Sequence, residues 1–363
     1  MSQPEILIEE ISPNGNVQAL VEQTEYCCHF YLHGQESSAF GVKSCWVRNF
    51  RAAPEHLDVA SMRSGKPPML PRSHCRHPDG APPFEKSELG IIWAEEGDAA
   101  ALAQHGDLLA VIPSWSGTNG FHGYARDCIG DSPLCWELGT SATNVLFARY
   151  ERALRFWQLW SENNNLWPRL RDELCGSLEG RFGRHSNYYA IDGGNWPPKA
   201  ILQIPSSGNV VLATIGVCIR PQPKIEMHYK DPAPHRRIEL GIGLDASLSD
   251  DAIKKLASYI SAQSNLPWSN FTFLGKGHTI PSDVSSELSG GRFPFILLVT
   301  SSLGAPSVPL PQFQGDPVRL FWMIPISESE RRFAEDHGSA ELINRLERSG
   351  VNWIATMRRA SVC

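Results

Sequence analysis

Apolar and aromatic residues fall into short runs along the first part of this chain, a pattern typical of strands. The strand-like runs are residues 5–11, 26–32, 89–94 and 108–113. Between the first two, Asn14-Gly15 predicts a turn. The stretch 54–83 is rich in proline, which excludes regular helix and central strand, so a long loop is expected there.

One short helix is predicted in this part of the chain. Asp98 is a suitable cap, the residues that follow are rich in alanine, and Gly106 is a suitable stop. Strand, short helix and strand would then form an α+β layer.

Helical periodicity becomes clear after residue 145. Apolar side chains recur at spacings of three and four residues, which predicts an amphipathic helix whose aromatic stripe lies in a core. These residues are Leu146, Tyr150, Leu154, Trp157 and Trp160. Further helices are expected from about residue 168, from 250 after the cap Ser249, from the capping box 327–330 to Gly338, and over 339–350. Strands are expected at 209–219, 237–244, 293–299 and 318–326.

The stretch Leu266–Pro281 combines aromatic residues with a glycine turn. Phe271 and Phe273 alternate with Thr272, so a strand with its aromatic side chains in the core of the second module is expected. Gly275-Lys-Gly277 does not have the spacing of a phosphate-binding loop. His278 has no obvious catalytic neighbour in the sequence, so a structural or surface role is expected.

The chain has 363 residues, 42% of them apolar, which is enough for two cores. Small polar residues at 139–144 mark a change of composition. We therefore predict an α+β protein of two mixed modules, an acidic one over residues 1–147 and a sheet packed with helices over 148–363.

Charge is distributed unevenly between the two parts. Residues 1–148 hold 9 Lys and Arg against 18 Asp and Glu, a net charge of −9, whereas the remainder has +3. An acidic front part argues against nucleic acid as its ligand and suits a basic protein partner, although the charge could also serve solubility alone. The residues expected to contact a partner are Glu95, Glu96, Asp98, Trp115, Phe121, Asp127 and Asp131. The last four belong to or follow a loop rich in glycine and aromatic residues.

Motifs for chemistry are weak. Cys27-Cys28-His29 and His74-Cys75-Arg76-His77 lack the paired spacing of zinc ligands, and no cofactor is predicted. Ser116 lacks the flanking glycines of a hydrolase nucleophile, and His122 with Asp127 has no third catalytic member. The main polar concentration, His228, His235, Arg236, Arg237 and Glu239, could line a cleft with His278 or form a solvated edge.

The expected location is the cytoplasm. Nine cysteines, an odd number, are spread over the whole chain, which favours reduced thiols. No stretch approaches the roughly 18 apolar residues of a membrane span, and the sequence does not start with a basic region followed by an apolar run.

Four stretches together resemble the bacterial branch of the suppressor-of-fused domain family, from about residue 150 to 360. They are Arg236-Arg-Ile-Glu-Leu-Gly-Ile-Gly-Leu244, Leu266-Pro-Trp268, Gly275-Lys-Gly-His-Thr-Ile-Pro281 and Phe321-Trp-Met-Ile-Pro-Ile-Ser-Glu-Ser-Glu330. The front segment 93–127 also looks like a module found ahead of that domain in bacterial proteins.

The resemblance implies a mixed α/β protein-binding domain without a catalytic set. The animal member binds a transcription factor, and many bacterial members are thought to be immunity proteins against polymorphic toxins, including those of type VI secretion. It therefore implies an immunity protein that binds and neutralises a cognate toxin effector, for example a nuclease. The alternative from the residues is an enzyme or small-molecule sensor with a cleft near His228, His235, Glu239 and His278.

Overall fold

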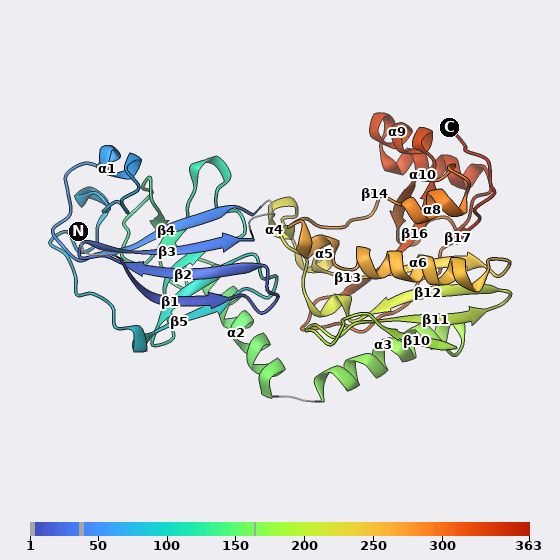
Figure 1. Ribbon diagram of the computed structural model, residues 1–363, viewed down its shortest axis with the longest axis horizontal. Helices are drawn as coiled ribbons and strands as arrows, with labels where there is room; N and C mark the ends of the chain where they lie inside the picture. Colours follow the sequence, from blue (N-terminus) through green and yellow to red (C-terminus); the bar gives the residue numbers. More distant parts are fainter. Residues whose placement is uncertain (1–3, 36–39, 163–164) are drawn as a thin grey trace. The chain divides into compact units, whose positions relative to one another are not determined.

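The computed structural model describes residues 4–35, 40–162 and 165–363 and shows an α+β fold (Figure 1). Contacts divide the chain into two compact units. The first comprises Met1–Glu162 together with Ser269–Phe271, and the second comprises the rest. The predicted boundary at 147/148 therefore differs from the division by contacts, which falls after Glu162.

Two antiparallel sheets pack face to face in the first unit. One has the order β1-β2-β3-β4 and the other the order β5-β6-β7-β8-β9, with a parallel pair only between β8 and β9. Their bounds are Glu5–Ile11, Val17–Gln23, Cys27–Gly34 and Val42–Asn49 for the first sheet, and Leu89–Trp93, Ala100–Gln104, Asp107–Ile112, Tyr124–Ala125 and Trp136–Glu137 for the second. Residues such as Phe30 and Leu102 share one core between the sheets. The turn at Asn14-Gly15 is confirmed, and the proline-rich stretch contains only short helices, α1 (Val59–Arg63) among them.

The prediction of a short helix after Asp98 is wrong. Residues Ala100–Gln104 form strand β6, which pairs with β5 on one side and β7 on the other. Local propensity favours alanine in helices, but here both faces of the strand are buried, Leu102 toward the other sheet and Ala101 toward α2. His105 and Gly106 both have positive φ, as the tight turn from β6 to β7 requires.

Helix α2 (Leu146–Glu162) forms as its periodicity predicts, but it packs in the first unit instead of opening the second. Leu146 and Tyr150 lie in a core with the alanines of β6, and the Trp157 indole donates to the Trp93 carbonyl at 2.8 Å. Of the predicted stripe, Leu154 is exposed. The helix completes a sheet, sheet and helix arrangement.

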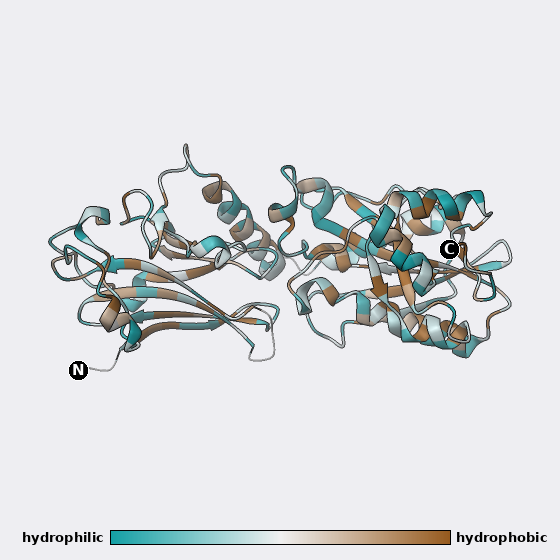
Figure 2. Cartoon of the chain, turned by 90° about the horizontal axis from the view of Figure 1, so that it is seen from above, coloured by the Kyte–Doolittle hydropathy of each residue, from teal (hydrophilic) through white to brown (hydrophobic). Residues whose placement is uncertain are grey.

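The second unit is built on a mixed sheet of the order β10-β11-β12-β13-β16-β15-β14, with β17 beside β13. The strands are β10 (Asn187–Ala190), β11 (Ala200–Ser206), β12 (Asn209–Ile215), β13 (Arg237–Asp245), β14 (Thr279–Pro281), β15 (Phe295–Val299), β16 (Val318–Ile326) and β17 (Ile354–Ala355). The helices are α3 (Leu166–Phe182), α4 (Ile225–His228), α5 (Ala233–Arg236), α6 (Asp250–Gln263), α7 (Leu266–Ser269), α8 (Asp283–Leu288), α9 (Glu328–His337) and α10 (Ser339–Arg348). Figure 2 shows the apolar residues concentrated along the strands.

Strand β13 lies inside this sheet, antiparallel to β12 and parallel to β16. Its predicted apolar face, Ile238 to Leu244 in alternation, is confirmed, and this face packs against α6. The other face is also buried, because α3 contacts β11 and β12 on that side. Two glycines on it leave room for aromatic rings: a Cβ on Gly243 would lie 2.6 Å from the Trp353 ring.

The C-terminal elements follow the sequence closely. Ser249 caps α6 by accepting from the Ala252 N–H, and Ser327 and Glu330 form the predicted capping box of α9. Arg359 holds the buried Glu330 carboxylate with two bonds of 2.6 and 2.8 Å.

The prediction of a strand at Phe271–Phe273 is wrong. Ser269 ends the short helix α7, and Phe271 adopts a positive φ of 48°. Its ring lies 4.9 Å from that of Phe40, inside the core of the first unit and not of the second. Phe273 is half-buried among histidines. The alternation of these aromatic residues reflects two different surroundings, not a pleated strand.

Candidate functional site

Two loops of the first unit bring aromatic residues to an exposed surface. Phe121 lies in the loop before β8 and Tyr124 begins β8, while Ile129 and Asp131 lie in the loop before β9 and Trp136 begins β9. We call these five residues the aromatic surface. The Phe121 ring centroid lies 4.7 Å from that of Trp136 and 4.9 Å from that of Tyr124. Phe121 is buried, whereas Trp136 is 38% and Ile129 45% exposed.

Hydrogen bonds within and between the loops fix their shape. The Gly117 N–H donates to the Phe121 carbonyl at 2.7 Å, and the Ser132 hydroxyl donates to the Cys135 carbonyl at 2.6 Å. The Trp136 N–H joins the loops by donating to the Gly123 carbonyl at 2.8 Å. Gly123 must be small, because a Cβ there would lie 2.6 Å from the Val111 carbonyl oxygen. These contacts present Trp136 in a defined orientation.

One acidic residue, Asp131, lies near Tyr124 in this surface. Burial raises the pKa of Tyr124, and the nearby Asp131 carboxylate adds to this effect, while a bond with Trp115 opposes it. Asp131 is exposed and makes no ion pair with any of the described residues. Trp115 itself is half-buried. Of the seven predicted contact residues, Trp115, Phe121 and Asp131 are therefore the ones that belong to this region.

The other acidic residues of the prediction are buried. Glu95, Glu96 and Asp98 follow β5 and are 3%, 3% and 1% exposed. Arg152 and Arg149 of α2 pair with Glu95 and Glu96 at 2.8 and 3.2 Å. The acidic turn thus contributes to packing around α2, and in this conformation it offers little surface to a partner.

Asp127 is also buried, at 4% exposure. The Arg48 guanidinium donates to its carboxylate at 2.6 Å, and His77 lies 3.8 Å away. His122, its predicted companion, donates no bond to it. Asp127 therefore ties β4 to the loop that precedes the aromatic surface.

Sequence reasoning did not select Tyr124, Ile129 or Trp136. The available signal was the turn composition Gly-Asp-Ser-Pro at residues 130–133, three residues before Trp136. That signal identifies a loop, but it does not reveal that the loop lies beside Phe121.

Three histidines of the second unit do come together, as the alternative hypothesis requires. His228 and His278 flank the Phe273 ring, with centroids 4.6 and 4.9 Å away, and His235 stacks on Tyr229 at 3.6 Å. Burial lowers the pKa values of His235 and His278, which disfavours their charged forms. They form an aromatic cluster without a buried carboxylate.

Glu239 lies apart from these histidines. It is 1% exposed and accepts hydrogen bonds from the Thr214 hydroxyl at 2.6 Å and from the N–H groups of Gly216 and Cys218 at 2.8 and 3.1 Å. Burial raises the pKa of the Glu239 carboxyl, although these hydrogen bonds act to lower it. The polar concentration on β13 is thus internal, and the expectation of a solvated edge is wrong for Glu239.

Arg237 is likewise internal, at 0% exposure. Its guanidinium donates to Asp316 at 2.9 Å and to the carbonyls of Cys218 and Ile219. β13 has neighbouring strands on both sides and is buried from Arg237 to Leu244 whatever the polarity of the residue, so its buried charged residues require partners.

The cysteines of both cysteine–histidine motifs are free thiols. The Cys27 sulfur lies 3.8 Å from His29 Nδ1 on β3, while Cys75 and Cys128 are paired only through an isolated β-bridge of their backbones. Within the described ranges, no group of three or more His, Cys, Asp or Glu residues is arranged to bind a metal ion.

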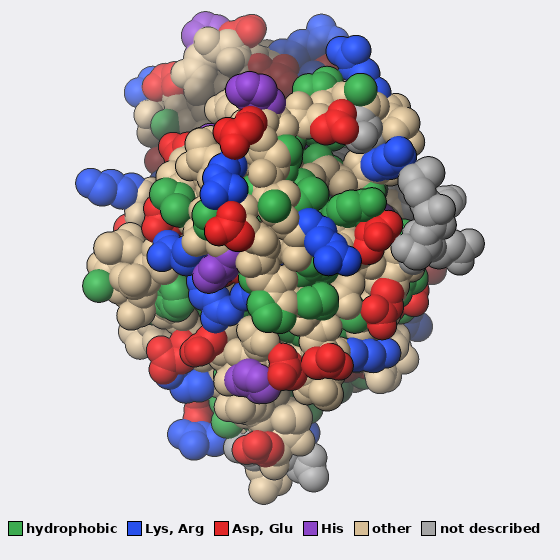
Figure 3. All heavy atoms as spheres, turned by 90° about the vertical axis from the view of Figure 1, so that its left-hand side faces the viewer, with side chains coloured by type: hydrophobic (Ala, Val, Ile, Leu, Met, Phe, Trp, Pro, Cys, Tyr) green, Lys and Arg blue, Asp and Glu red, His purple; other side chains and the backbone are tan. Residues whose placement is uncertain are grey.

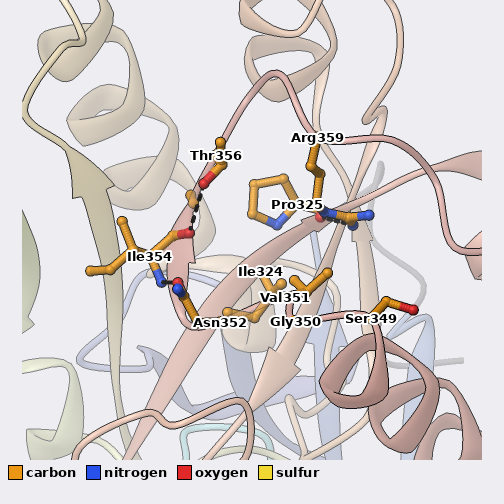
Figure 4. Close-up of a pocket in the computed structure, with 10 residues that line it drawn as sticks. Ile324, Pro325, Ser349, Gly350, Val351, Asn352, Ile354, Thr356 and Arg359 are labelled. Carbon is orange, nitrogen blue, oxygen red and sulfur yellow. Dashed lines mark hydrogen bonds between the residues drawn. The ribbon is translucent and has the colours of Figure 1, made fainter.

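A cavity of about 150 Å³ lies in the second unit between the end of α10, β16 and the segment leading to Arg359 (Figure 4). Apolar groups such as Ile324 and Val351 line it with Ser349, Asn352 and Thr356. Its one charged side chain, Arg359, is held by Glu330. No histidine, cysteine or carboxylate lines the cavity, so it offers no general acid or base.

Figure 3 shows acidic and basic side chains interspersed over one face of the molecule, with only small apolar groups between them. The net charge of −9 for residues 1–148 does not gather into one acidic patch on that face. In the described part of the chain, every helix is too short or too polar to span a bilayer.

A match to a family model supports the suppressor-of-fused resemblance in the second unit. The family model described as suppressor of fused protein (SUFU) matches residues 195–360, so it begins just before β11 and includes neither α2 nor α3. A solved structure titled "the Sufu-Fu complex crystal structure" is similar with 15% sequence identity and a TM-score of 0.38, covering 55% of this chain and 92% of that one. No curated protein matches the chain.

Proposed function

We propose that this chain is a protein-binding protein that binds a cognate bacterial toxin effector and neutralises it by direct contact. The observation that supports protein binding is the aromatic surface, which is partly exposed and whose loops are held by hydrogen bonds. The family match over residues 195–360 supports the same class, because the suppressor-of-fused resemblance implies binding and, in its bacterial branch, immunity against toxins.

The aromatic surface has the composition of an energetic centre for protein association. Tryptophan and tyrosine are over-represented among the residues that dominate binding energy, because they bury large areas with few rotatable bonds. The backbone bonds around Gly117, Ser132 and Trp136 hold the loops in place. Because the loops are already held in place, binding a partner costs less conformational entropy than it would if the loops were mobile.

The charge of the front part supports a basic effector, such as a nuclease. Opposite net charges accelerate the encounter of two proteins, and this acceleration decreases as salt screens the charges. Association with the effector is then expected to slow as ionic strength rises, with a smaller change in the dissociation rate.

The enzyme or sensor hypothesis is less favoured. It needs Glu239 beside the histidines, but Glu239 binds the turn after β12 instead. His228 and His278 instead pack against the ring of Phe273, and His235 stacks on Tyr229.

The test uses the full chain and each toxin-like protein found to be encoded by a neighbouring gene. The effector is expressed in a bacterial host with or without the chain, and growth is followed; binding of the purified proteins is then measured by calorimetry. We expect the chain to restore growth and to bind the effector with a defined stoichiometry. An unrelated toxin serves as control. Growth arrest despite the chain, with no heat of binding, would contradict the proposal.

A further inference from the structure

We propose that the aromatic surface binds an arginine side chain of its protein partner, with the guanidinium over the exposed Trp136 indole and beside the Asp131 carboxylate. This inference rests on the proposed function and adds to it the chemistry of the contact. A planar cation that stacks on an aromatic ring and also pairs with a carboxylate is bound by both groups at once.

The backbone places the two groups side by side. Asp131 and Trp136 are partners in an antiparallel bridge. Residues directly opposite in such a bridge have Cβ atoms about 5 Å apart and project their side chains to the same side. The carboxylate and the indole are therefore neighbours within reach of one guanidinium.

The rings behind Trp136 determine its orientation. Phe121 meets it at 63° with centroids 4.7 Å apart, and Tyr124 meets it at 79° with centroids 6.4 Å apart. Both neighbours pack against the indole in an edge-to-face arrangement, and 38% of Trp136 stays exposed.

The chain's own cations near this surface have other partners. Arg76 binds Glu137 at 3.1 Å, and Arg126 contacts Asp127 at 3.9 Å. Among the described residues, no lysine or arginine lies over the Trp136 ring, although such contacts occur elsewhere, for example Arg48 over Phe84 at 4.2 Å. An external cation would thus meet a partly exposed aromatic ring and a carboxylate that the described chain does not itself neutralise.

Arginine fits this pair of groups better than lysine. The guanidinium is planar, is weakly hydrated and has several N–H donors in its plane, so it can stack on the indole while donating to Asp131. An ammonium group loses more hydration on an indole face and has no plane to stack.

The experiment measures binding of a short arginine peptide to the full chain by fluorine NMR. The chain is labelled with 5-fluorotryptophan, and the Trp136 resonance is assigned from its absence in Trp136→Phe. The probe is acetyl-Gly-Arg-Gly-amide, compared with its citrulline and lysine counterparts, of which citrulline has the same shape without the charge. Asp131→Asn tests the carboxylate, and Asp79→Asn is the matched control, since Asp79 is an exposed acid paired with Arg72.

We expect the arginine peptide to shift the Trp136 resonance saturably and the citrulline peptide to leave it unchanged. Asp131→Asn should weaken binding about twofold to fivefold, the range of an exposed ion pair, while Asp79→Asn leaves it unchanged. The resonances of the buried Trp46 and Trp322 should not move, which verifies the fold.

Equal shifts with citrulline, or unchanged affinity in Asp131→Asn, would overturn the inference. Equal affinity for the lysine peptide would overturn the assignment to arginine. The peptide experiment does not use the effector, so it tests the arginine contact independently of the proposed function. An effector that binds wild type and Asp131→Asn equally refutes only the arginine contact, and an effector that the wild type does not bind refutes the proposed function.

Discussion

The internal carboxylate of Glu239 provides a quantitative test of the second unit. Replacing Glu239 by leucine removes the acceptor of three hydrogen bonds and leaves the N–H groups of Gly216 and Cys218 buried without a partner. An unsatisfied buried donor costs about 1–3 kcal/mol, so Glu239→Leu should lower the free energy of unfolding by about 2–6 kcal/mol. Glu239→Gln keeps one carbonyl oxygen for both N–H groups and should cost only about 1 kcal/mol.

Urea unfolding of the three proteins measures this difference, and amide exchange of Gly216 and Cys218 locates it. Both amides should exchange faster in the leucine variant at urea concentrations well below the transition. If leucine costs no more than glutamine, the carboxylate does not hold the turn after β12.

The pH dependence of the same site has a defined sign. Burial raises the pKa of Glu239 above its unfolded value, so the folded protein binds this proton more tightly than the unfolded chain does. This group therefore contributes most stability below its unfolded pKa and loses that contribution as pH rises through its folded pKa. Glutamine cannot titrate, so the stability of Glu239→Gln relative to wild type should improve as pH rises.

Three further changes test other parts of the fold. Burial lowers the pKa of His29 to about 4, so stability is lost as pH falls from 6.5 toward 4, by up to about 3 kcal/mol, and His29→Gln should flatten this part of a urea-derived stability profile. Phe271→Ala removes the ring that packs on Phe40 and should lower the free energy of unfolding by about 3–5 kcal/mol in urea; a cost near zero would mean that Phe271 is not part of the first core. Gly243→Ala places a Cβ against Trp353 and should cost about 1–3 kcal/mol, seen as a lower Tm, and an unchanged Tm would contradict the tight packing.

Local sequence signals were sufficient where local interactions determine the structure. Ser249 and the pair Ser327 and Glu330 cap their helices through contacts within one turn, and both caps were predicted. The alternating face of β13 was predicted for the same reason, since its period of two does not depend on distant residues.

The errors occur where tertiary packing overrides local preference. The alanines of β6 favour a helix by propensity, but small side chains also suit a strand packed closely on both faces. Phe271 and Phe273 alternate like strand residues, yet each belongs to a different core or cluster. No prediction covered β2, although Val17, Ala19 and Val21 alternate with polar or half-buried positions.

The candidate site was predicted in part. Composition identified the loop with Trp115 and Phe121, but charge alone selected Glu95 and Glu96, which pair with arginines of α2. A sequence does not show which acids will find an internal cation. Trp136 was missed because its neighbours come from a separate loop.

The three residues Ser269–Phe271 have a consequence for how the protein is made. They belong to the first unit, although the chain on both sides of them belongs to the second. During synthesis from the N-terminus, the ribosome must therefore add more than a hundred residues after α2 before Phe271 can reach the core around Phe40. We expect the first unit to remain incompletely packed on the ribosome during this interval and to be most vulnerable then to proteases and dependent on chaperones.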